Sequence, residues 1–347
     1  MFEINPTKWY KLTNEQIMSE NGTVPLVSNS STDNGVMGFS NLEANNSGNS
    51  ISCSDTTLGA DTMYYQKDDF IGYQHIQHLV PKFERFNQSI ALYIISACRV
   101  ATSNAGYDYA HKFNRAAMNS TVILLPTTSN NEIDFDFMES FIRELEEERV
   151  KKLKTYLKVS GLDNYELTQT EQKALTDFNA LEWQEFNVES LFGKSTRGKR
   201  LKGDDRIEGD LPFVTAGEAD TGISAFISND VEVFSANTTT IDMFGSAKYR
   251  NYDYGADDHV AVVHTENLNK YAAIFVTTAC HKSAHNGQFN YGHNFYAKDA
   301  DELNIMLPVR NGVPDYEAMQ DFISAVQKLV IKDVVEYTNT VIATDKE

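Results

Sequence analysis

Pro25-Leu-Val-Ser-Asn-Ser-Ser-Thr-Asp-Asn-Gly-Val-Met-Gly-Phe39 recurs as Pro212-Phe-Val-Thr-Ala-Gly-Glu-Ala-Asp-Thr-Gly-Ile-Ser-Ala-Phe226, at an offset of 187 residues (212 − 25). Further matches continue at offsets of 182 and 181. They are Ala97-Cys98 with Ala279-Cys280, Asn104 with Asn286, Tyr109-x-His111-x-Phe113 with Tyr291-x-His293-x-Phe295, Leu125-Pro126 with Leu307-Pro308, and Met138 with Met319. A nearly constant offset over this length indicates two copies of one domain.

The length and composition agree with a duplicated globular chain. The chain has 347 residues, of which 41% are hydrophobic and 11% aromatic, enough for two domains of ordinary size. Apolar runs such as Ile90–Ile95 are too short to cross a bilayer, and the first residues lack a signal-peptide pattern. The three cysteines form no closely spaced pair. We therefore expect a reduced, cytoplasmic protein with no membrane partner.

The net charge restricts how the chain can meet nucleic acid. At −19, the chain is repelled by phosphate at long range, which argues against autonomous, non-specific binding to nucleic acid. Local basic patches, or basic subunits in a larger complex, remain compatible with DNA contact.

Short apolar runs separated by Gly, Asn, Asp and Ser fill most of each copy. Strands are predicted for Ile90–Ile95, Val231–Ser235 and Tyr271–Thr277. The turn-rich spacing favours a mixed or antiparallel, barrel-like sheet with few helices in each copy. The predicted fold class is α+β.

Each copy is followed by a predicted long helix, over Asp134–Lys158 and about Asp315–Val341. A capping box at Thr168-x-x-Glu171 predicts a shorter helix between the copies. The long helices carry apolar stripes made of Phe141, Leu145, Leu153 and Leu157, and of Ile323, Val326, Val330 and Val334. Antiparallel pairing would bury both stripes, whereas packing of each stripe on its own domain is the alternative. A helix of about 25 residues is roughly 37 Å long. One turn of B-DNA is about 34–36 Å long, so such a helix pair would hold the two domains about one DNA turn apart.

Catalytic and metal chemistry receive little support. Cys98 with His111, and Cys280 with His293, could form thiol–base pairs, but the spacing does not show that they meet. A zinc site at Cys280, His281, His285 and His293 is disfavoured, since the first copy has Arg99 and Ser103 in place of the middle two histidines. Glycine-rich phosphate loops are absent from the sequence. We expect a non-catalytic chain without a metal.

Polar and basic side chains in turn-rich segments are the candidate DNA contacts. Groove recognition uses Arg, Lys, Asn, Gln and His, flanked by cations that hold the phosphates. The candidates are Arg197, Lys199, Arg200, Lys202, Lys248, Arg250, Lys282, His285 and Asn286 in the second copy, and Gln66, Lys67, His75, Arg99, Asn104, Lys112 and Arg115 in the first. Each could instead be a solvated surface charge. The cluster Arg197–Lys202 could also bind an acidic protein.

The chain resembles the specificity subunits of type I restriction–modification systems, or the similar subunits of type IIB systems. The resemblance is carried by Arg197-Gly-Lys-Arg-Leu201, Gly209-Asp-Leu-Pro-Phe-Val214, Gly222-Ile-x-x-Phe226 and the Leu-Pro before each long helix. The resemblance implies four parts: a first target recognition domain at 1–131, a central helical spacer at 132–180, a second target recognition domain at 181–311 and a distal helix at 312–347. It also implies that the distal helix pairs with the helix of the central spacer in an antiparallel coiled coil.

The resemblance also implies partners and cofactors. Each recognition domain would read one half of a bipartite site in double-stranded DNA. DNA adenine methyltransferase subunits would dock on the chain, and a restriction or translocase subunit is a further expected partner. S-adenosylmethionine and Mg²⁺ would be bound by partner subunits and not by this chain.

Two features depart from this resemblance or allow another function. The first copy shows no counterpart of Arg197–Lys202, which leaves its route to phosphate open. A duplicated protein-binding scaffold, or an acidic inhibitor that mimics DNA, would suit the net charge of −19. A duplicated cysteine hydrolase is the third alternative.

Overall fold

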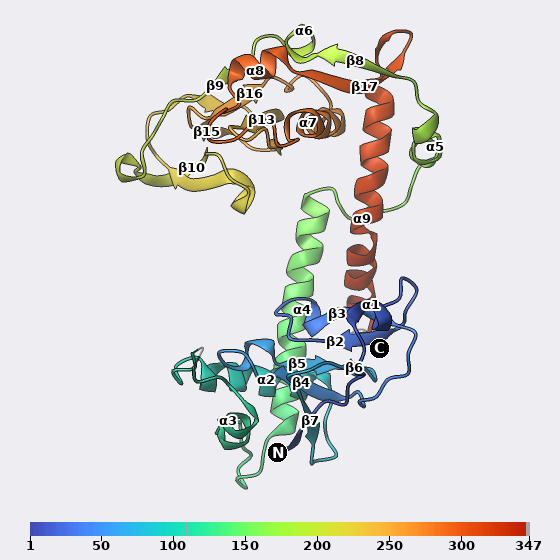
Figure 1. Ribbon diagram of the computed structural model, residues 1–347, viewed down its shortest axis with the longest axis vertical. Helices are drawn as coiled ribbons and strands as arrows, with labels where there is room; N and C mark the ends of the chain where they lie inside the picture. Colours follow the sequence, from blue (N-terminus) through green and yellow to red (C-terminus); the bar gives the residue numbers. More distant parts are fainter. Residues whose placement is uncertain (109, 345–347) are drawn as a thin grey trace. The chain divides into compact units, whose positions relative to one another are not determined.

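The computed structural model describes residues 1–108 and 110–344, and the chain divides into two compact units. Unit 1 comprises Met1–Leu153 together with the end of the chain from Val341, and unit 2 comprises Lys154–Thr340. Figure 1 shows that each unit contains its own strands and a helix beside them.

Unit 1 is built from two sheets and a central helix. The larger sheet has the order β1-β7-β4-β5, formed by Phe2–Pro6, Ile76–Pro81, Ser50–Ser54 and Tyr64–Gln66. The smaller sheet has the order β3-β2-β6, formed by Val36–Ser40, Val24–Val27 and Ile71–Gly72, with β2 parallel to β6. The helices are α1 (Asn14–Ile17), α2 (Gln88–Thr102), α3 (Arg115–Ser120) and the first part of α4 (Phe135–Val159), with short 3₁₀ turns η1 (Asp33–Gly35) and η2 (Ala60–Thr62).

Unit 2 repeats this plan and adds a third sheet. Its sheets have the orders β14-β13-β16-β9 (Ala247–Arg250, Thr238–Asp242, Val260–Val263, Thr196–Arg197), β11-β10-β15-β12 (Ile223–Ile227, Glu208–Val214, Tyr254–Ala256, Val233–Phe234) and β18-β17-β8 (Val313–Pro314, Asn304–Arg310, Trp183–Asn187). The helices are α5 (Gln169–Asp177), α6 (Val188–Phe192), α7 (Lys270–Ala284), α8 (Ala297–Glu302) and α9 (Tyr316–Thr344), with 3₁₀ turns η3 (Phe178–Ala180), η4 (Gly203–Asp205) and η5 (Ala219–Gly222). The expected barrel-like sheet is thus replaced in both units by separate sheets.

The repeated sequence forms the same hairpin in both units. Pro25 pairs with Phe39 between β2 and β3, and Pro212 pairs with Phe226 between β10 and β11. The turns are also alike, because Asn34–Gly35 and Thr221–Gly222 all have positive φ values. Glycine adopts this backbone region without strain, so the repeated Asp-x-Gly marks the position where the chain must turn.

Two predicted strands are central helices. Ile90–Ile95 lies in α2, and Tyr271–Thr277 lies in α7. Ile90, Ile94 and Ile95 are buried on one face of α2, and the side chain of Asn87 caps its first turn. A short apolar run fits a buried helix as well as a buried strand, which explains the error. The third predicted strand, Val231–Ser235, is reduced to β12.

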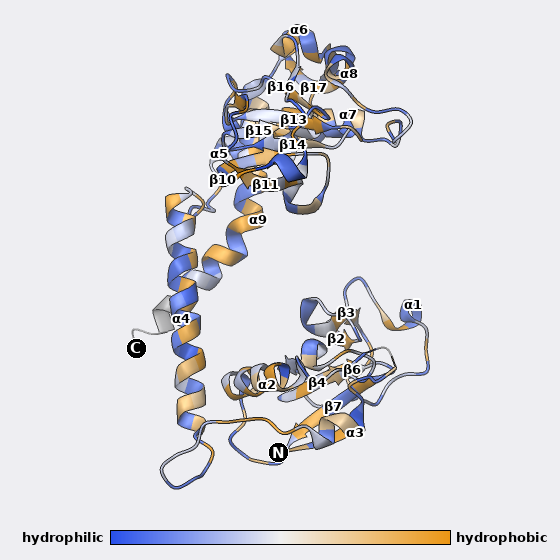
Figure 2. Cartoon of the chain, turned by 90° about the vertical axis from the view of Figure 1, so that its left-hand side faces the viewer, coloured by the Kyte–Doolittle hydropathy of each residue, from blue (hydrophilic) through white to orange (hydrophobic). Residues whose placement is uncertain are grey.

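The two long helices and the short one are confirmed. α4 and α9 begin and end within three residues of the predicted positions, and Thr168 and Glu171 form the predicted capping box of α5. Hydrophobic and hydrophilic residues alternate along α4 (Figure 2). No helix in the described part of the chain is both long and apolar enough to cross a bilayer.

The apolar stripes of the long helices have different surroundings along their length. Phe141 packs edge-on against Tyr93 of unit 1, and Ile323 packs on the core of unit 2. Within unit 2, α4 and α9 are in contact through a hydrogen bond from Lys154 Nζ to Asn339 Oδ1 (2.9 Å). Of the other stripe residues, Leu157 is buried, Leu153, Val326 and Val334 are half-buried, and Leu145 and Val330 are exposed. Packing on the parent unit therefore accounts for part of each stripe.

Candidate nucleic-acid interface

The most basic exposed segment of unit 2 follows strand β9. Residues 194–206 contain six cations and two acids, a local charge of +4 in a chain of net charge −19. Arg197, Lys199, Arg200 and Lys202 are exposed, and none of them forms an ion pair with any residue that the structure describes. These four predicted contacts are therefore available to phosphate.

The backbone of unit 2 holds this segment in place. Arg197 pairs with Ala261 at the edge of the sheet, and a Cβ atom on Gly198 would lie 1.6 Å from the carbonyl oxygen of Ala256. Leu201 donates its amide to Asp257 Oδ1 (3.3 Å). Arg206 donates to Ser224 Oγ (3.2 Å) and lies over the ring of Phe213 (5.1 Å). Arg206 therefore ties the basic segment to the β10–β11 hairpin.

Unit 1 has a counterpart of this segment, contrary to the sequence expectation. Strand β1 pairs with β7 in unit 1 as β9 pairs with β16 in unit 2. Gln77 of β7 and Ala261 of β16 hold the same position in the two sheets. Pro6 pairs with Gln77 and Arg197 pairs with Ala261, so Pro6 is the counterpart of Arg197. The next residue, Thr7, meets Gly72, just as Gly198 meets Ala256. The counterpart of Arg197–Lys202 is therefore the stretch from Pro6 to Lys11, with exposed Lys8 and Lys11. In the sequence this counterpart is visible as Lys8-Trp-Tyr-Lys11. The offset of 187 residues between the two hairpins does not align it with Arg197–Lys202, so the sequence comparison missed it.

Two predicted DNA contacts, Gln66 and Arg250, are buried and bonded internally. Arg250 Nε donates to Thr240 Oγ1 (2.9 Å) and Arg250 Nη1 to the carbonyl of Thr221 (2.9 Å). In unit 1, Gln66 Nε2 donates to Ser52 Oγ (2.9 Å) and to the carbonyl of Asn34 (3.1 Å). Both side chains fasten the hairpin turn to the sheet at the same register position. Because both side chains are buried, neither can reach a DNA duplex, and neither belongs to the candidate interface.

Two further predicted contacts serve the scaffold. Lys248 is largely buried and donates to Glu218 Oε1 (3.1 Å) and Ser246 Oγ (2.9 Å). Arg99 donates to the carbonyls of Ala60 (3.3 Å) and Met63 (3.2 Å), which fastens α2 to the start of β5. Its counterpart His281 accepts the amide of Ala247 through Nδ1 (3.1 Å) at the start of β14. Burial lowers the pKa of His281, which suits an accepting, neutral ring.

The remaining candidates lie in several separate places. Lys67, Asn104 and Arg115 of unit 1 are exposed, and Lys112 is half-buried. His75 is exposed and lies 3.3 Å from Asp55. Lys282, His285 and Asn286 are exposed around the end of α7, where Lys282 and Asn286 line a groove formed largely by apolar side chains.

The geometry gives no support to thiol or zinc chemistry. Burial raises the pKa of Cys53 and Cys280 to about 12 and that of Cys98 to about 11, so these thiols stay protonated at neutral pH. Among the described residues, the one cluster spaced for a metal is Asp257-Asp258-His259. Asp257 already accepts the amide of Leu201, and Asp258 lies 3.2 Å from His259. No metal is assigned to it.

Two similar units, each presenting a basic segment beside a hairpin, match a family of DNA specificity subunits. The family model described as the type I restriction modification DNA specificity domain matches residues 1–155 and 180–337. The chain belongs to this family, whose members are non-catalytic subunits of restriction–modification systems.

Individual relatives agree with this assignment. The chain is 26% identical over 290 residues to the specificity subunit S.BcgI of a type II restriction enzyme from Heyndrickxia coagulans, covering 81% of this chain and 79% of that protein. Its fold is similar to that of the S subunit of a type I restriction–modification system from M. genitalium, with a TM-score of 0.62, 13% identity, and 99% and 90% of the two chains covered.

Proposed function

We propose that this chain reads a bipartite, gapped site in double-stranded DNA, with one half-site bound by each repeat. The observation that carries the proposal is the pair of basic segments, 6–11 and 197–202, at equivalent positions of the two units. Their exposed lysines and arginines supply phosphate contacts that hold each unit in register on the duplex.

The difference between the repeats supports two different half-sites. Residues that hold the scaffold keep their roles, as Gln66 and Arg250 do at the hairpin turns. Exposed residues differ, since Pro6 and Trp9 stand in the first segment where the second has Arg197 and Arg200. A shared scaffold with different exposed side chains is suited to reading different base sequences.

In this proposal the recognition domains are residues 1–131 and 181–311. The spacer at 132–180 and the distal helix at 312–347 form an antiparallel coiled coil that sets the distance between half-sites. The buried residues Leu157 and Val335 and the hydrogen bond between Lys154 and Asn339 support this pairing. The exposed Val330 is left for a further partner.

Catalysis is assigned to partner subunits. We propose that DNA adenine methyltransferase subunits, which bind S-adenosylmethionine, dock on the chain, and that a restriction subunit using Mg²⁺ can join them. With a net charge of −19, tight binding to DNA is expected only in the complex.

Methylome sequencing of a host that expresses the complete operon tests the proposal. The expected result is one gapped motif carrying N6-methyladenine, in which replacement of residues 181–311 by another recognition domain changes one half only. Replacement of residues 1–131 should change the other half. An ungapped motif, or one that neither replacement alters, would overturn the proposal.

A further inference from the structure

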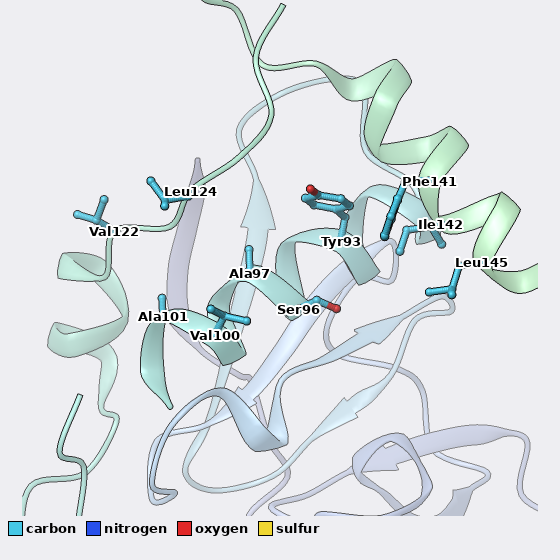
Figure 3. A pocket seen from close by; sticks show the side chains of 10 residues that line it. All are labelled: Tyr93, Ser96, Ala97, Val100, Ala101, Val122, Leu124, Phe141, Ile142 and Leu145. Atoms are coloured by element: carbon cyan, nitrogen blue, oxygen red, sulfur yellow. The ribbon is translucent and has the colours of Figure 1, made fainter. Parts of the chain in front are cut away.

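An apolar groove on unit 1 lies between α2, the first turns of α4 and the extended segment 122–125. Its volume is about 550 Å³, and its lining includes Tyr93 and Val100 of α2, Val122 and Leu124 of the extended segment, and Phe141 of α4 (Figure 3). Val100, Val122 and Leu124 are 76%, 82% and 90% exposed. Such a contiguous apolar surface is characteristic of an interaction site.

The groove has a counterpart in unit 2 at equivalent positions. Tyr93, Val122 and Leu124 correspond to Phe275, Asn304 and Met306 at an offset of 182, and Phe141 corresponds to Phe322 at 181. The duplication has therefore preserved the groove between the helix, the extended segment and the long helix. The two grooves differ in what lies against them.

In unit 2, a strand pairs with the edge of the groove. The five residues from Asn304 to Pro308 in β17 pair antiparallel with Trp183–Asn187 of β8. Trp183 stacks on Phe275 (6.1 Å between ring centroids). Phe178, five residues before Trp183, stacks on Phe322 with 4.0 Å between the ring centroids. The chain thus supplies both a strand and aromatic rings to this groove.

In unit 1, the equivalent edge is unpaired. Among the residues that the structure describes, none forms a backbone hydrogen bond with any amide or carbonyl of residues 122–125. Strand β1 cannot take the role of β8, because it is already paired with β7 as the counterpart of β9. Unpaired strand edges are templates for an added strand. The groove of unit 1 therefore lacks the strand that β8 supplies in unit 2, whereas Phe141 already has a stacked aromatic neighbour, Phe137, at 6.0 Å between ring centroids.

The negative charge of the first turns of α4, beside the groove, indicates which kind of partner can bind there. Residues 135–148 of α4 contain six acids (Asp136, Glu139, Glu144, Glu146, Glu147, Glu148) and one base (Arg143). Arg85 pairs with Asp136 and Glu139, so the local net charge is −4. This charge repels DNA, and in a dimer through this face it would bring two acidic helices together. A basic segment of a different protein suits the site.

We propose that an extended, basic segment of the methyltransferase subunit adds a strand to residues 122–125. The proposal rests on the proposed function for the identity of the partner. The occupant does for unit 1, from another chain, what β8 does for unit 2. Because unit 2 already holds its own strand, the described residues offer one such site, on unit 1.

Hydrogen exchange and affinity measurements on the purified methyltransferase complex test this proposal. The amides of residues 122–125 should exchange rapidly in the free chain and become protected in the complex. Leu124→Pro removes one edge donor from an exposed, unpaired position, so we expect normal folding and at least tenfold weaker methyltransferase binding. Leu58→Ser, which removes a 56% exposed apolar side chain elsewhere on unit 1, should bind within twofold of the wild-type chain.

The outcomes separate the two proposals. A complex in which residues 122–125 stay unprotected, or in which Leu124→Pro binds as tightly as wild type, overturns the inference and leaves the proposed function standing. Absence of any wild-type complex overturns both. Protection that appears in the chain alone and grows with its concentration assigns the edge to a second copy and overturns the methyltransferase as occupant. Circular dichroism confirms that each variant is folded.

Discussion

Arg250 donates a hydrogen bond to the carbonyl of Thr221 at 2.9 Å, and so fixes a turn whose backbone has positive φ values. Gln66 does the same for Asn34 in unit 1 at 3.1 Å. Two chemically different residues thus perform one structural task at equivalent positions. In sequence both looked like DNA contacts, and the fold instead makes them internal supports of the hairpin.

Arg250→Ala should destabilise unit 2 by about 3 kcal/mol, because it leaves the carbonyl of Thr221 and the hydroxyl of Thr240 without buried donors. Urea unfolding followed by circular dichroism measures the loss. Arg250→Gln should fall between wild type and Arg250→Ala, since Gln serves at the equivalent position. The exposed Arg197→Ala is the matched control and should change the free energy of unfolding by less than about 0.5 kcal/mol. Equal stability of Arg250→Ala and wild type would contradict this role.

The buried carboxylate of Glu171 should make unit 2 sensitive to acid. Burial by itself would raise its pKa, but hydrogen bonds from Lys328, Ser324 and Thr168 outweigh burial and lower the pKa to about 2. Lys328 Nζ lies 2.8 Å and Ser324 Oγ 2.6 Å from its oxygens, which clips α5 to α9.

A lowered folded-state pKa stabilises the protein above the ordinary value of 4.5, and this stabilisation is lost as the pH falls from there towards 2. Glu171→Gln should therefore cost about 3 kcal/mol at pH 7 and flatten the pH dependence of stability between pH 5 and pH 2.5. Thermal unfolding across this pH range measures both effects. Glu148→Gln, at an exposed pair with Lys152, is the control. Parallel pH profiles for wild type and Glu171→Gln would contradict the assignment.

The two basic segments should contribute equivalent phosphate contacts. Lys199→Ala/Lys202→Ala and Lys8→Ala/Lys11→Ala should each weaken binding of the assembled complex to all DNA sequences. The slope of log K against log salt should fall by roughly 0.9 for each contact removed. Fluorescence anisotropy at several salt concentrations provides the slope. Lys152→Ala, on α4, should leave it unchanged, whereas an unchanged slope in both double variants would remove the segments from the interface.

The cysteines should be dispensable for function. Cys98→Ser/Cys280→Ala is expected to assemble a complex that methylates DNA at the wild-type rate, because burial keeps both thiols protonated. Native Cys280 should react with a thiol reagent only after unfolding, as a stopped-flow assay with and without denaturant can show. Loss of methylation by a folded variant would reopen thiol chemistry.

Removing the buried Leu157 side chain should weaken the packing of the long helices. Leu157→Ala is expected to cost about 2–4 kcal/mol and to lower the melting temperature measured by calorimetry. The exposed Val159→Ala, two residues further along α4, should have little effect. A stability equal to wild type for Leu157→Ala would argue against helix pairing at this position.

The sequence by itself determined the duplication, the two long helices and the capped helix at Thr168, because these depend on local spacing and repeated letters. It could not decide whether Ile90–Ile95 is a strand or a helix, since a six-residue apolar run suits either in a buried setting. It also assigned Arg250 and Gln66 to the surface from their chemistry alone.

Tertiary structure decided which cations are free and which segments correspond. Strand pairing aligned Pro6–Lys11 with Arg197–Lys202, although insertions between strand and hairpin shift the sequence offset. Burial and hydrogen bonding turned Arg250 into a scaffold residue, and the absence of a pairing partner left residues 122–125 open in the described chain. The duplication can be read directly from the order of the residues. Whether a side chain or a strand edge is exposed depends on which strands, distant in sequence, pair in the fold.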